Sequence, residues 1–105
     1  MPMKNIFNQI KRGLRAKKEI KNLEEHYIVE LDLARSMVCA NQLFAEGEFN
    51  GNGQKTLDIF KHYTEELRSE IMQGASEHDI MATKQFLRAD MCAMLYTMMN
   101  VKFKE

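Results

Sequence analysis

Three residues of the types that bind metal ions, Asp58, His62 and Glu66, follow one another at four-residue intervals. On a helix this spacing places them one turn apart on a single face, where imidazole and carboxylate groups can bind zinc. The apolar residues of the same segment recur on the other face, so Asp58, His62 and Glu66 are expected to point into solvent. There they lack the buried hydrogen-bond partners that orient metal ligands. We therefore predict ordinary side-chain pairs on a solvated helix face, and no metal site.

The segment 46–54 has a partial resemblance in spacing to a calcium-binding loop between two helices. Glu46, Glu48 and Asn50 occupy the first, third and fifth positions of such a loop. The twelfth position, which normally supplies a bidentate Glu, is Leu57. Two Asn-Gly steps and three glycines instead indicate turns and a mobile backbone, so we predict a flexible connector.

Nucleophilic catalysis is not indicated either. Cys39 and Cys92 lie in helical patterns beside apolar residues, with no neighbouring His or basic residue to lower the thiol pKa. We predict that both are reduced, buried thiols. The sequence also lacks a P-loop and a dinucleotide fingerprint. We predict a non-enzymatic protein that needs no cofactor.

The composition predicts a single all-α domain. Among 105 residues there is one proline, and the few β-branched residues favour helices over strands. The patterns predict a three-helix bundle over about 5–45, 56–73 and 77–103. The first helix, at about 1.5 Å per residue, would be longer than a compact domain of this size, so it must bend at Gly13 or project at one end. The longest apolar run, residues 91–96, is too short to span a membrane, and we predict a cytoplasmic location.

The last predicted helix is apolar on two opposite sides. One stripe contains Ile80, Leu87, Met91, Met94 and Met98, and Ala89, Ala93, Tyr96 and Phe103 lie on the other. The first helix also has two apolar stripes, whereas three helices around one core need one each. The surplus predicts a homodimer, with interface residues Met37, Phe44, Met91, Met94, Tyr96, Met98, Met99 and Phe103. The alternative is that the methionines are simply core.

The charge is unevenly distributed along the chain. Residues 1–21 contain seven basic residues and one acidic residue, a net charge of +6, and residues 22–105 carry −6. We divide the chain into a basic amphipathic arm, residues 1–18, and a helical bundle, residues 19–105. The residues that would bind phosphate or an acidic partner are Lys4, Lys11, Arg12, Arg15 and Lys18. The arm could instead dock on its own acidic body, and a membrane surface is the least favoured partner.

These features favour a protein that acts by binding rather than by catalysis. The first hypothesis is an adaptor or inhibitor that docks on a larger protein, motivated by the surplus apolar surface. The second is an accessory protein whose basic arm binds the phosphate backbone of a nucleic acid.

Overall fold

The computed structural model describes residues 2–43 and 51–102, and all its regular elements are helices. They are α1 (Pro2–His26), α2 (Ile28–Leu43), α3 (Asn52–Gln73) and α4 (Glu77–Lys102). The prediction of an all-α fold is confirmed. The prediction of three helices is wrong, because the long N-terminal helix is divided in two at Tyr27.

Gly13 does not bend the chain. It lies inside α1, and a methyl group added to it would meet no atom within 4 Å. The break falls at Tyr27, where helical hydrogen bonding continues: its N–H donates to the carbonyl of Leu23, and its carbonyl accepts from Leu31, each over 2.9 Å. The Tyr27 ring is buried and lies edge-on to Phe60, with centroids 6.2 Å apart. The bend therefore occurs where the chain is anchored in the core.

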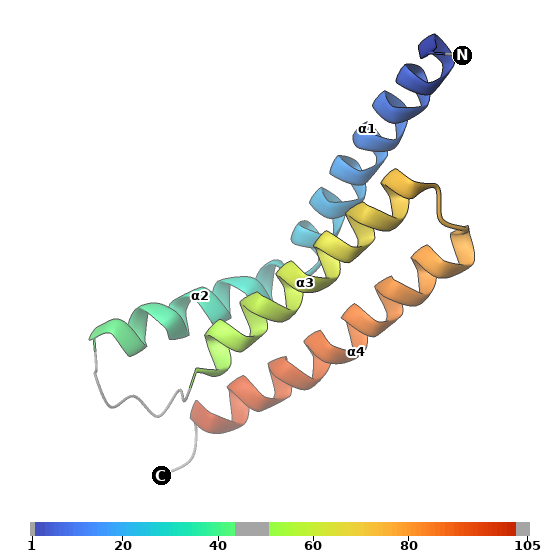
Figure 1. Ribbon diagram of the computed structural model, residues 1–105. Helices are drawn as coiled ribbons and strands as arrows, with labels where there is room; N and C mark the ends of the chain where they lie inside the picture. Colours follow the sequence, from blue (N-terminus) through green and yellow to red (C-terminus); the bar gives the residue numbers. More distant parts are fainter. Residues whose placement is uncertain (1, 44–50, 103–105) are drawn as a thin grey trace.

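The central element is α3, which packs against each of the other three helices (Figure 1). Helices α1 and α2 both pack on α3, which lies along this bent pair. After the turn that follows α3, α4 runs back antiparallel to it. The molecule is elongated, with principal extents of 63 × 25 × 17 Å.

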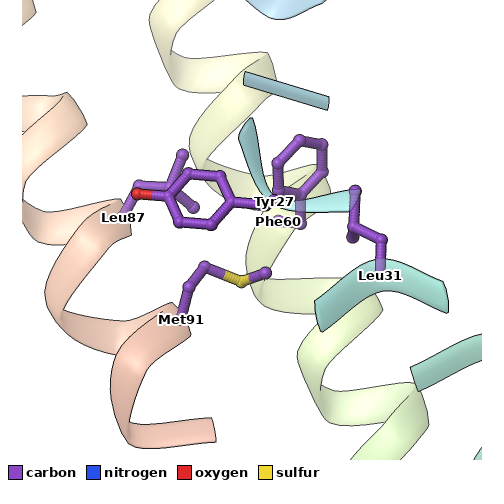
Figure 2. Close-up of a cluster of buried hydrophobic side chains, with 5 residues drawn as sticks. All are labelled: Tyr27, Leu31, Phe60, Leu87 and Met91. Atoms are coloured by element: carbon purple, nitrogen blue, oxygen red, sulfur yellow. The ribbon is translucent and has the colours of Figure 1, made fainter. Parts of the chain in front are cut away.

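The core lies between these helices as three small clusters. The main cluster brings together the α1–α2 junction, α2, α3 and α4. It contains Tyr27, Leu31, Phe60, Leu87 and Met91 (Figure 2). A second cluster holds Ala16, Leu67, Ile71 and Ile80, and a third holds Ala34, Met37 and Met98. The predicted stripe of Ile80, Leu87, Met91, Met94 and Met98 on the last helix is thus the one that the fold buries.

Local chemistry explains the turn between α3 and α4. Gly74 ends α3 with φ 76°, the left-handed conformation that glycine adopts without a Cβ penalty. Its N–H donates to the carbonyl of Ile71 over 3.1 Å. Ser76 then caps α4, since its hydroxyl accepts a hydrogen bond from the N–H of Asp79 over 3.1 Å.

The connector prediction is wrong at its C-terminal end. Gly53 belongs to α3 and is buried, and a methyl group there would lie 2.5 Å from the carbonyl oxygen of Ala34 and 2.9 Å from the Cβ of Met37. Gly53 therefore allows α2 and α3 to approach each other closely. The residues considered for calcium binding, Glu46, Glu48 and Asn50, lie outside the described residues.

Candidate interaction surfaces

Two apolar surfaces are left uncovered by the described part of the chain. The first, which we call the α4 face, is the outward side of α4 and consists of Phe86, Ala89, Cys92, Ala93, Tyr96 and Met99. The second, which we call the α1 stripe, runs along the first half of α1 and consists of Ile6, Phe7, Ile10 and Leu14.

The α4 face is apolar because its charges end at Asp90. From Met91 to Val101 the sequence has no charged residue. Phe86, Tyr96 and Met99 expose 63%, 73% and 51% of their surfaces, and the residues between them include two alanines. Large side chains around small ones at spacings of three and four residues form a seam into which another helix can pack.

The opposite side of α4 is used within the fold. The Tyr63 hydroxyl donates to the Asp90 carboxylate over 2.8 Å, and the Thr83 hydroxyl donates to Glu70 over 2.5 Å. The hydrogen bond to Asp90 is the main cause that raises the pKa of Tyr63 above its ordinary value. These bonds fix the rotation of α4 about its axis, and so determine which side faces outward.

The predicted interface residues divide between the two sides of the fold. Met37, Met91, Met94 and Met98 are buried within the chain, where they serve as core. Tyr96 and Met99 are exposed on the α4 face. Phe44 and Phe103 lie outside the described residues. Among the predicted interface residues that the structure describes, only Tyr96 and Met99 can therefore contact a partner while the fold stays intact.

Basic side chains of the predicted arm attach α1 to the turn between α3 and α4. Arg12 donates to the carbonyl of Met72 over 3.2 Å, near the negative end of the α3 dipole. Arg15 makes two hydrogen bonds to the carboxylate of Glu77, over 2.6 and 2.7 Å, and these raise the pKa of the guanidinium. Ala16, the residue after Arg15, is buried in the core. Helix α1 thus crosses residue 18 without interruption and is held from Arg12 onward.

The other lysines of this segment remain available. Lys11, Lys17 and Lys18 are exposed and form no ion pair with any residue that the structure describes. Of Lys4, only its place in α1 is described. The predicted phosphate-binding set is therefore split: Arg12 and Arg15 bind the body, and Lys11 and Lys18 are exposed near the α1 stripe. Lys17, which the prediction did not include, is exposed as well.

The candidates for catalysis and metal binding lie on the surface. Gln54 donates to Asp58 over 3.0 Å, and His62 lies 3.6 Å from Glu66, both as exposed pairs one turn apart. Within residues 2–43 and 51–102 there is no group of three potential metal ligands, and no helix long and apolar enough to cross a membrane. A shallow hollow of about 390 Å³ near the α1–α2 bend is lined by Lys21, Glu24, Glu25 and Ile28.

The prediction that the two thiols are buried is wrong, since Cys39 and Cys92 are both exposed. Their apolar neighbours in sequence lie on adjacent helix faces and do not cover them. Cys92 is instead part of the α4 face.

Sequence reasoning did not place Phe86 or Cys92 among the interaction residues, and from the amphipathic arm it selected only the charged side chains. A signal for Cys92 is the uncharged run that begins after Asp90, and a signal for Phe86 is its helical spacing from Ala89 and Ala93. A signal for the α1 stripe is its offset around the helix from Ala16 and Ile20, the residues that continue into the core.

Comparisons with protein-family models, with curated proteins and with solved structures gave no match to this chain.

Proposed function

We propose that the protein acts without catalysis, as an adaptor or inhibitor that binds other protein chains through the α4 face. In this proposal two copies pair through that face, and the pair docks on a larger protein. The observation that carries the proposal is a continuous exposed apolar surface, from Phe86 to Met99, without a charged side chain beyond Arg88 and Asp90. Contiguous apolar surface of this kind marks interaction sites in soluble proteins.

Pairing between copies is supported by the shape of the face. Ala89, Cys92 and Ala93 are small enough to let a second helix approach closely, and Phe86, Tyr96 and Met99 surround them. A two-fold pair would bring the same face of each copy together and cover both at once. Because no like charges lie on the C-terminal part of the face, the pair would form without repulsion there.

The test compares two exposed apolar side chains of nearly equal exposure on different helices. Met99 lies on the α4 face with 51% of its surface exposed, and Ile28, at the start of α2, has 47% exposed. Light scattering of the wild type is expected to give a dimer. Met99→Glu is expected to give a monomer of unchanged helicity by circular dichroism, because it places a charge in the seam, whereas Ile28→Glu is expected to remain dimeric.

Two results would contradict this proposal. A monomeric wild type that binds no protein partner would leave the α4 face without a role. Global unfolding of Met99→Glu, with Ile28→Glu unaffected, would indicate that Met99 belongs to the core.

A further inference from the structure

The α1 stripe is directed away from the body of the protein. Ile6, Phe7, Ile10 and Leu14 expose 54–64% of their surfaces. At 100° per residue, the centre of this stripe lies about 115° around the helix from the line of Ala16, Ile20 and Tyr27 that enters the core. A flat surface lying against the stripe would therefore meet a side of α1 that does not face the core.

The attachment of α1 leaves its first turns free of the other helices. Arg12 and Arg15 fix the helix at the α3–α4 turn, and the residues before them extend beyond that turn (Figure 1). Ten residues of helix correspond to about 15 Å. The projecting part carries Ile6, Phe7 and Ile10 and meets no neighbouring helix.

Positive charge borders the α1 stripe on one edge and at its C-terminal end. Lys11 and Lys18 lie along the edge, and Lys17 lies three residues after Leu14, in line with the stripe. All three are exposed and form no ion pair with the described residues. Residues 1–18 contain no acidic residue. An apolar stripe that includes a Phe, bordered by lysines, is the pattern of a helix that lies in the interface of an anionic bilayer.

We propose that the first half of α1 binds the surface of an anionic lipid bilayer. The α1 stripe enters the boundary between headgroups and acyl chains, and the lysines reach the headgroup phosphates. This surface and this partner are distinct from those of the proposed function, which concerns the α4 face. From the sequence alone, a membrane surface is the least favoured partner of the arm. The structure changes this order, because it leaves the α1 stripe exposed and does not dock it on the body.

Two other partners fit these observations less well. A nucleic acid would neutralise the lysines but would leave four large apolar side chains in water. A second arm would cover the apolar side chains but would bring the lysines of both copies together around the contact. An anionic bilayer satisfies both groups.

The test is flotation of the full-length protein with vesicles of phosphatidylcholine alone or mixed with phosphatidylglycerol. Binding is expected only with the anionic lipid. Phe7→Gln combined with Ile10→Gln is expected to weaken partitioning at least about tenfold, because two apolar side chains no longer enter the bilayer. Lys17→Gln combined with Lys18→Gln is expected to weaken it by about fivefold for each lysine, and raising the salt concentration should act in the same direction.

The matched control is Ile28→Gln combined with Val29→Gln on α2, where the native side chains expose 47% and 66% of their surfaces. This pair removes a similar apolar surface outside α1 and is expected to leave vesicle binding unchanged. Circular dichroism checks that all variants keep their helicity, as expected for side chains outside the core.

Three outcomes would overturn the proposal. The first is an absence of flotation with anionic vesicles. The second is flotation that the α2 control reduces and the Phe7, Ile10 variant does not. The third is binding to duplex DNA, or dimerisation through the arm, that accounts for the exposed groups while vesicles stay unbound.

Discussion

At the scale of single residues, the two glycines Gly13 and Gly53 occupy helices for opposite reasons. Gly53 has no room for a side chain, since a methyl group would lie 2.5 Å from the Ala34 carbonyl oxygen. Gly13 has open space around it. Glycine is therefore required at position 53 and only tolerated at position 13.

We expect Gly53→Ala to lower the free energy of unfolding by about 1–3 kcal/mol, because α2 and α3 must move apart to admit the methyl group. Gly13→Ala is the matched control and is expected to raise it by about 0.5–1 kcal/mol through better helix propensity. Urea unfolding followed by circular dichroism measures both. A Gly53→Ala variant as stable as wild type would contradict the close approach of α2 and α3.

The hydrogen bond from Tyr63 to Asp90 predicts a dependence of stability on alkaline pH. The bond requires the protonated phenol, and it raises the pKa of Tyr63 above the ordinary value of 10.0. Its contribution is complete below pH 10.0 and is lost as the pH rises through the folded-state pKa. Tyr27, whose pKa is raised mainly by burial, acts in the same direction.

We therefore expect the free energy of unfolding of the wild type to fall as the pH rises above 10.0, the ordinary pKa of tyrosine. The fall is expected to be smaller for Tyr63→Phe. At neutral pH the variant should be the less stable protein, since it has lost the bond. Urea unfolding at neutral and alkaline pH tests this, with titrations common to both proteins cancelling in the difference. A wild-type-to-variant difference that stays constant with pH would show that the bond does not contribute.

At the scale of elements, α1 is joined to α4 by charged side chains in addition to its apolar contacts. The ammonium group of Lys84 lies 2.5 Å from the Glu19 carboxylate, with 28% and 21% of the two side chains exposed. Because water screens this pair less than a surface pair, its attraction is stronger. Arg35 and Asp32, 3.1 Å apart within α2, are mostly exposed and provide a comparison.

A double-mutant cycle with Glu19→Gln and Lys84→Gln is expected to give a coupling energy of about 1 kcal/mol, near the top of the range for surface pairs. The same cycle at Asp32 and Arg35 is expected to give about 0.3 kcal/mol. Both are read from urea unfolding at low and high salt. Equal coupling at the two sites would mean that the Glu19–Lys84 pair is as fully solvated as the surface pair.

Element boundaries show where local patterns are sufficient. The end of α3 at Gly74 and the start of α4 after Ser76 follow from capping chemistry within a few residues. The division of the N-terminal helix does not. Among the residues after the first turn of α1, Gly13 has the lowest helix propensity, but the bend is at Tyr27, the residue that packs against Phe60.

At the scale of the whole molecule, the protein is longer than its size requires. The radius of gyration of the Cα atoms is 17.0 Å, against about 13 Å for a compact domain of 100 residues. An elongated arrangement around one central helix covers α3 on several sides and leaves α1 and α4 each with an open side. The two proposed binding surfaces are these open sides.

The sequence by itself determined the helical content, the positions of the apolar stripes and the α3–α4 turn, because 3.6-residue periodicity and capping are local properties. Only the tertiary structure decided which of the two apolar sides of α4 is covered, since both are apolar and the choice depends on where α3 lies. It likewise decided that Gly53 is a packing residue, that the thiols are exposed, and that Met91 and Met98 are core while Tyr96 and Met99 are surface. Each of these depends on neighbours distant in sequence, which no local pattern specifies.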